Sequence, residues 1–138
     1  MHNRRVDLPL LEEDFQSEGM IQPSRIVPDV KAPECGVFCF FGDVVAETVA
    51  VRPERRQVAV LSSEARLTPV WEIEISGRRL AVLQPGVGAP QAAAFLEEVI
   101  AMGCTRIIAC GGAGALIPDL VRGHAVVVGS AVRDEGTS

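Results

Sequence analysis

A strand, a glycine-rich turn, a helix and a second strand follow one another in the middle of this chain, and this order constrains its fold more than any other feature. Residues 80–83 are a short apolar run, and residues 84–90 read Gln-Pro-Gly-Val-Gly-Ala-Pro. Residues 91–102 then repeat apolar side chains at helical spacing up to Gly103, and residues 106–110 are the next apolar run. The pattern predicts a βαβ unit with a right-handed crossover, whose two strands are parallel neighbours in a sheet.

The other apolar segments extend this unit into a larger domain. Further strands are predicted at residues 36–42, at residues 57–61, in a hairpin of residues 69–75 and 79–83 that turns at Ser76 and Gly77, and at residues 124–128. Residues 43–51 are compatible with either a helix or a strand. Residues 1–34 are rich in charge and proline, which predicts an extended arm ahead of a domain at residues 35–138.

Composition favours a single domain with an aliphatic core. The chain has 138 residues, of which 48% are hydrophobic and only 4% are aromatic. Valine, alanine, leucine and isoleucine must therefore supply most of the core, and this mixture favours buried strands that are covered by helices. We expect an α/β protein.

Charge and cysteine content exclude several classes of function. The net charge is −5 and no run of Lys or Arg is long enough to follow a phosphate backbone, which excludes a nucleic-acid partner. No apolar run approaches the roughly 20 residues of a membrane helix and the N-terminus lacks a signal-peptide core, so we expect a cytoplasmic protein without a membrane partner. The four cysteines lack zinc-site spacing, and His2 and His124 lie far apart, so we expect free thiols and no metal.

Two glycine-rich turns, at residues 84–90 and 111–114, each follow a predicted strand. Because the carboxyl ends of parallel strands share one edge, the turns should lie together where open α/β sheets bind ligands. Gly86 and Gly88 flank Val87, so the backbone there is able to approach a ligand closely and to offer it amide groups. Simple structural turns use glycine in the same way, and the pattern alone leaves that alternative open.

Three better-known glycine motifs do not fit. A dinucleotide-binding turn needs a third glycine, but the residues after Gly88 are Ala89, Pro90 and Gln91. A P-loop needs Gly-Lys-Ser or Gly-Lys-Thr, and a nucleophile elbow needs a serine between glycines. Neither pattern is present at these turns.

The glycine turns are part of a longer order of motifs that resembles the purine and uridine nucleoside phosphorylase superfamily. The matching segments are Gly86-Val87-Gly88-Ala89-Pro90, the helix at residues 92–102, Gly111-Gly112-Ala113-Gly114 and the residues that follow to Asp119, then Gly123, and residues 131–138. The resemblance covers residues 70–138. It implies a three-layer α/β/α sandwich with a mixed central sheet, of which this chain would be the truncated N-terminal part.

The resemblance also implies an activity. Members of this family cleave the N-glycosidic bond of a purine or pyrimidine nucleoside without a cofactor. The phosphorylases are glycosyltransferases that use inorganic phosphate as co-substrate, and the nucleosidases use water. The transition state resembles an oxocarbenium ion, so the site must hold an anion or water below the sugar and stabilise a departing base. A small-molecule nucleoside is thus the implied partner, and a homo-oligomer is the implied assembly.

By the same resemblance, substrate-binding residues are implied but no catalytic residue is identified. The implied residues are Gly86, Val87 and Gly88 beside the ribose, and Gly112, Ala113 and Gly114 beneath the ribose and the base. The first turn therefore faces the sugar, and the second turn supports both halves of the nucleoside.

The phosphate contacts depart from the family pattern. Ala109 and Gly112 stand where the family carries an arginine and a serine or threonine, and the early Gly-Asp-Pro is replaced by Gly42, Asp43 and Val44. Each lost charge-assisted hydrogen bond is worth roughly 1.5 to 3 kcal/mol. The remaining candidates for phosphate binding are Gly42, Gly112 and Arg66. Arg66 would replace the missing arginine by acting across a subunit boundary, as an arginine does in the family. The alternative is that Arg66 is a solvated surface arginine.

Three functions follow from these observations. The first is a nucleoside phosphorylase. The second is a phosphate-independent nucleosidase, because Ala109 and Gly112 lack anion-binding side chains. The third is a truncated, non-catalytic fragment that binds or oligomerises, because the family domain is longer than this chain and an apolar edge would be left uncovered.

Overall fold

The computed structural model describes residue 19, residues 21–132 and residues 136–137. Its helices and strands are, in chain order, α1 (Pro23–Ile26), β1 (Cys35–Cys39), α2 (Gly42–Ala50), β2 (Arg56–Ser62), β3 (Leu67–Ile75), β4 (Arg78–Leu83), α3 (Ala89–Ala101) and β5 (Arg106–Cys110). Within this part of the chain, no helix has the length and apolar character needed to cross a membrane.

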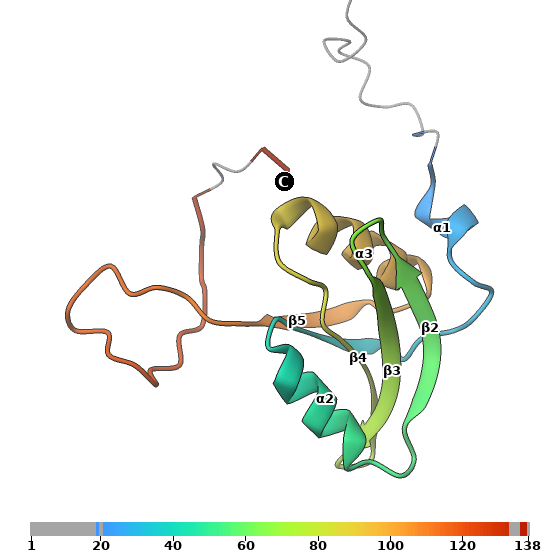
Figure 1. Cartoon of the computed structure of the whole chain (residues 1–138), viewed down its shortest axis with the longest axis horizontal. Helices are drawn as coiled ribbons and strands as arrows, with labels where there is room; N and C mark the ends of the chain where they lie inside the picture. Colours follow the sequence, from blue (N-terminus) through green and yellow to red (C-terminus); the bar gives the residue numbers. More distant parts are fainter. Residues whose placement is uncertain (1–18, 20, 133–135, 138) are drawn as a thin grey trace, which may run out of the picture.

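The five strands form one mixed sheet with the order β2-β3-β4-β1-β5 (Figure 1). The β2-β3-β4 part is antiparallel, and β1 pairs in parallel with β4 on one side and with β5 on the other. A helix covers each face, which makes the three layers of an α/β/α sandwich, as the sequence predicts.

The alternating side chains of β4 show how the two faces are filled. Ala81 and Leu83 pack in one core cluster with Phe95 of α3, and Val82 packs in a second cluster with Val45 of α2. Because successive residues of a strand point to opposite faces, a strand with a helix on both sides must be apolar at nearly every position. This requirement explains the unbroken apolar run at residues 80–83.

The turns follow their predicted chemistry. Ser76 and Gly77 link β3 to β4 with φ angles of 51° and 75°, the left-handed pair that a tight hairpin requires. Gly103 has a φ of 102° directly after α3, so it ends the helix as predicted. Residues 43–51, which the sequence left open, form α2.

Two predictions of topology are wrong. β4 and β5 are parallel but are not neighbours, because β1 lies between them. The strand predicted at residues 124–128 does not form, and these residues are exposed, although the outer edge of β5 has no paired strand. Apolar spacing identifies a segment that is able to form a strand, but pairing needs a neighbour that spacing does not reveal.

The segment ahead of β1 is tied to the core by backbone hydrogen bonds at Ala32 and Glu34. The Ala32 amide donates a hydrogen bond to the Met102 carbonyl over 2.9 Å, and Ala32 is buried. α1 lies farther back in the same segment and packs beside α3 (Figure 1). The division into an arm at residues 1–34 and a domain at residues 35–138 stays a prediction, and most of the arm lies outside the described residues.

Gly36 in β1 is predicted to be essential for close packing. It lies between Ala81 of β4 and Ile107 of β5, and a Cβ atom at this position would lie 2.6 Å from the sulfur of the fully buried Cys104. Gly36→Ala should therefore lower the free energy of unfolding by about 2 kcal/mol, as overpacking of a core does. Urea unfolding of the purified protein measures this change.

The matched control is Gly114→Ala, because a Cβ there meets no atom within 4 Å and the φ angle is not left-handed. This variant should unfold at the wild-type urea concentration. A double variant of Gly36→Ala with Cys104→Ala should recover part of the loss. Wild-type stability of Gly36→Ala alone would contradict the packing argument.

Candidate functional site

The carboxyl ends of three parallel strands meet at one edge of the sheet. Phe38 of β1 pairs with Leu83 of β4, and Cys39 pairs with Cys110 of β5, so all three strands end level with one another. The turn at residues 84–88 follows β4, and the turn at residues 111–114 follows β5. Both glycine turns therefore leave the same edge, as predicted, but the end of β1 separates them.

Two glycines with left-handed backbone conformations shape the first turn. Gly86 and Gly88 have φ angles of 86° and 117°, which disfavour any side chain. The Gln91 side-chain amide lies against Gly86 and donates a hydrogen bond to the Pro85 carbonyl over 3.0 Å. Val87 between the two glycines is 88% exposed. The turn thus presents an apolar side chain to solvent directly ahead of the first turn of α3.

The second turn lies beside two phenylalanines that the sequence analysis did not select. A Cβ atom on Gly111 would lie 3.2 Å from the Cβ of Phe40, and one on Gly112 would lie 3.5 Å from the ring of Phe41. Neither glycine has a left-handed φ angle, so close approach to the rings, not backbone conformation, favours glycine here. Beyond Gly112 the chain is exposed and leaves the body of the domain as the orange loop in Figure 1.

Two of the three predicted phosphate contacts lie together. Gly42, at the start of α2, and Arg66, in the turn between β2 and β3, line the same cavity of about 150 Å³. Gln84 joins them, because its side chain lies 3.4 Å from the position of a Cβ on Gly42 and its oxygen accepts a hydrogen bond from Arg66 Nη1. Gly112 is not part of this cavity and lies instead against Phe41.

The start of α2 adds electrostatic character to this cavity. The helix begins at Gly42 without a side-chain cap, so backbone N–H groups of its first turn lack a capping acceptor. Such an end carries partial positive charge, and the Arg66 guanidinium adds a full one beside it. The sequence analysis did not identify Gln84, because a glutamine after a strand has no distinctive pattern. Its partner Arg66 lies 18 residues earlier in the chain, so no local pattern connects the two.

Two free thiols also lie at this edge. Cys39 and Cys110 are register partners on β1 and β5, and both are free. Partial burial raises the pKa of the Cys110 thiol, and its hydrogen bond with Cys39 raises that pKa further. The Cys110 thiol is therefore protonated at neutral pH and is a poor nucleophile. Across the described residues, no group of three or more His, Cys, Asp or Glu side chains is arranged to hold a metal ion.

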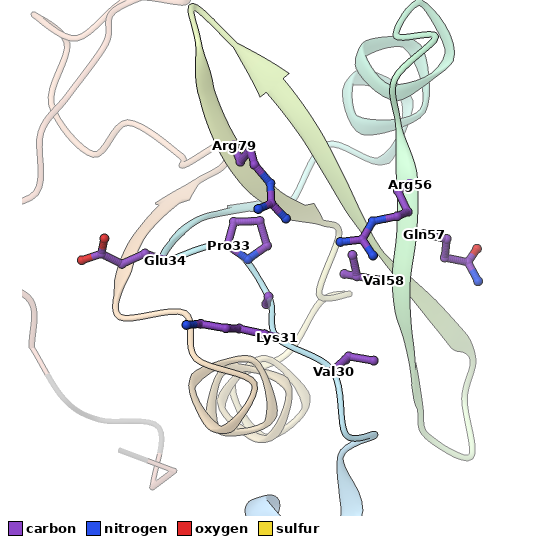
Figure 2. A pocket seen from close by; sticks show the side chains of 9 residues that line it. Val30, Lys31, Pro33, Glu34, Arg56, Gln57, Val58 and Arg79 are labelled. Atoms are coloured by element: carbon purple, nitrogen blue, oxygen red, sulfur yellow. The ribbon is translucent and has the colours of Figure 1, made fainter.

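A larger cavity, of about 720 Å³, lies away from all of these residues. It is formed at the opposite edge, where β2 and β4 begin, and by residues 30–34 (Figure 2). None of the predicted nucleoside or phosphate contacts lines it. The carboxyl edge combines exposed apolar side chains with backbone amides and one arginine, which suits a ligand with a flat apolar part and an anionic part.

Comparison with known proteins agrees with this geometry. A family described as "Phosphorylase superfamily" matches residues 34–138. A guanosine phosphorylase of Halorubrum lacusprofundi is 39% identical over 78 residues, and a uridine phosphorylase of Treponema pallidum is 37% identical over 59 residues. The solved structure of a uridine phosphorylase from Vibrio fischeri superposes with a TM-score of 0.52 and 25% identity.

These matches cover part of this chain and a smaller part of each relative. They include 56% of this chain and 32% of the Halorubrum protein, 43% and 23% for the Treponema protein, and 62% and 36% for the Vibrio structure. This chain thus spans about a third of the length of the relatives it matches.

The thiol pair gives a direct test of the edge geometry. Because its pKa is raised, Cys110 should react slowly with iodoacetamide at neutral pH, and its rate should climb as pH rises towards that raised pKa. Cys39→Ala removes the contribution of the neighbouring thiol, so Cys110 should then react faster at each pH. Mass spectrometry of the alkylated peptide measures the rate.

Cys35→Ala is the matched control, because Cys35 lies at the other end of β1 and should leave the Cys110 rate unchanged. Equal rates in the wild type and in Cys39→Ala would show that the two thiols are not in contact.

Proposed function

Because this chain belongs to the phosphorylase superfamily, we propose that its carboxyl edge binds a nucleoside in a protein that cleaves the N-glycosidic bond with inorganic phosphate. The observation that carries the proposal is the meeting of two glycine turns and an uncapped helix start at one edge, with Gly42 and Arg66 sharing a cavity there.

The nucleoside is proposed to lie across the two turns. Val87 is exposed between two glycines, so it offers an apolar contact to one face of the ribose. Phe41, half-exposed beside Gly112, offers a flat surface on which a base is able to stack. Gly112, Ala113 and Gly114 carry no bulky side chain, which leaves space for the base and the sugar between these contacts.

Phosphate is proposed to bind at the start of α2. Its oxygens would accept hydrogen bonds from first-turn amides near Gly42 and from the Arg66 guanidinium, which now donates to Gln84. Ala109 and Gly112 supply no side-chain donors, so Arg66 carries most of the electrostatic attraction. The relatives named above are guanosine and uridine phosphorylases, which supports phosphate in preference to water as the nucleophile.

The chemistry follows from charge separation. As the glycosidic bond breaks, positive charge grows on the sugar and negative charge on the departing base. An anion held at the start of α2 stabilises the sugar cation and is in place to attack it, which lowers the barrier through position and charge.

Val87 should contribute measurably to nucleoside affinity. Val87→Ala removes two methyl groups from the proposed ribose contact, which should weaken guanosine or uridine binding about threefold to tenfold. Isothermal titration calorimetry measures the dissociation constant. Val51→Ala is the matched control, since Val51 is also largely exposed but directly follows the end of α2 that lies away from Gly42. Equal affinities in both variants would reject the assignment of Val87 to the site.

Arg66 should determine phosphate affinity. Trp71 is the only tryptophan of the chain and lines the same cavity, so its fluorescence should report binding of inorganic phosphate. Arg66→Gln should weaken this binding about tenfold to a hundredfold, because it removes charge-assisted hydrogen bonds. Arg55→Gln is the matched control and makes the same change of charge at an exposed arginine, whose guanidinium donates to the backbone carbonyls of Ala50 and Arg52.

Activity assays then separate the alternatives. The phosphorylase proposal is supported if base is released only when phosphate is present and if the rate of release is lower in Arg66→Gln. Release without phosphate would instead identify a nucleosidase. If the purified chain binds a nucleoside but releases no base, the result would identify a non-catalytic binding module.

A further inference from the structure

The cavity of about 720 Å³ at the edge where β2 and β4 begin has the size of a small-molecule site. Ligand pockets commonly measure about 300 to 1,000 Å³. Its walls come from three separate parts of the chain: residues 30–34, residues 56–58 and Arg79. We call it the amino-edge cavity, and it lies across the sheet from the proposed nucleoside site.

Two arginines at this cavity share one carboxylate. Arg56 Nη2 and Arg79 Nη2 lie 2.8 Å and 2.6 Å from the same oxygen of Glu72, and Arg79 Nε donates to the other oxygen over 2.6 Å. The Glu72 side chain is only 14% exposed, whereas those of Arg56 and Arg79 are 61% and 58% exposed. Hydrogen bonding from Arg79 lowers the pKa of Glu72, so the carboxylate stays charged at neutral pH.

The sheet register explains this arrangement. Glu72 of β3 lies opposite Arg56 of β2 on one side and Ala81 of β4 on the other. Arg79 precedes Ala81 by two residues, so all three charged side chains are on the same face. That face is the one covered by α3, and residues 30–34, tied to the end of α3 through Ala32, close the cavity from the other side.

Charge in the amino-edge cavity is unbalanced. Lys31 lines it as well, so the lining carries three cations and one carboxylate, and with the buried Glu72 behind the arginines an excess of one positive charge remains. Glu34, the acidic residue among the lining residues, forms an ion pair with Arg106 over 3.3 Å, and Figure 2 shows it pointing away from the two guanidinium groups. Such an excess in a chain of net charge −5 favours an anionic ligand.

Apolar side chains complete the walls. Pro33 lies between the two guanidinium groups and Lys31 in Figure 2, and Val58 lies next to Arg56. A purely structural role does not need this arrangement, because one arginine already neutralises Glu72 and exposed ion pairs add only about 0 to 1 kcal/mol to stability. The exposed faces of both guanidinium groups remain available to a ligand.

We propose that the amino-edge cavity binds a phosphomonoester, with its phosphate on Arg56, Arg79 and Lys31 and its organic part against Pro33 and Val58. A phosphomonoester carries about two negative charges at neutral pH, so the net positive charge of the cavity attracts it. Guanidinium groups bind phosphate and carboxylate oxygens alike through paired N–H donors, and a phosphate differs in its third oxygen and its greater charge. The site is separate from the nucleoside site and does not depend on the proposed function.

Binding is tested with ribose 5-phosphate as the probe, by calorimetry and by amide shifts in nuclear magnetic resonance. Saturable binding is expected, with shifts centred on residues 30–34 and 56–58, and ribose without phosphate should not bind. Arg79→Gln should weaken binding about tenfold, in line with the loss of one charge-assisted contact. Lys31→Gln should weaken it too, and this variant leaves the Glu72 ion pairs intact.

Arg78→Gln is the matched control. It makes the same change of charge on the adjacent residue of β4, whose side chain points to the opposite face. Its affinity should stay within about twofold of the wild type, since long-range charge effects between exposed groups are screened by salt. Arg79→Gln should also leave the Trp71 response to inorganic phosphate unchanged, which separates this cavity from the one at Arg66.

Three results would overturn the proposal. These are equal losses in Arg78→Gln and Arg79→Gln, no saturable binding by the wild type, or shifts confined to the carboxyl edge. Succinate binding as tightly as ribose 5-phosphate would reject the assignment to phosphate in favour of carboxylate ligands.

Discussion

The parallel pairing of β1 with a strand on each side is the constraint on which the rest of this structure depends. Its register with β4 and β5 makes three strands end level, and it thereby brings segments that are far apart in the sequence to one edge. The pairing in turn requires Gly36, because the fully buried Cys104 occupies the space beside it. Without β1 between β4 and β5, the two glycine turns would have no fixed relation to each other.

The two edges of the sheet differ in chemistry because of the direction of the chain. α2 and α3 each follow a parallel strand, so both helices begin at the carboxyl edge, where their first-turn amides face outward. That edge presents backbone donors and exposed apolar side chains. The opposite edge carries charged side chains at the start of β2 and β4, where Glu72 gathers two arginines. One sheet thus supports two separate environments for ligands.

β5 is an edge strand whose outer side carries exposed apolar side chains. Ile108 is 68% exposed, and the apolar residues of the segment at 125–128 are exposed as well. A strand with apolar side chains and an open edge favours contact with further polypeptide. This exposure was expected from the sequence, and association between copies of the chain stays a prediction. The match to the phosphorylase superfamily includes β5 and the residues that follow it.

The sequence by itself determined the type of most elements, because apolar periodicity and glycine position are local. The strand at residues 106–110, the turn at Ser76 and Gly77 and the end of α3 at Gly103 all follow from neighbouring residues. Only the tertiary structure decided that β1 separates β4 from β5, that residues 124–128 have no partner strand, and that Gln84 meets Arg66. Strand order and side-chain contacts depend on the competition of all segments for the same hydrogen-bonding edges and core volume, and no local pattern records the outcome of that competition.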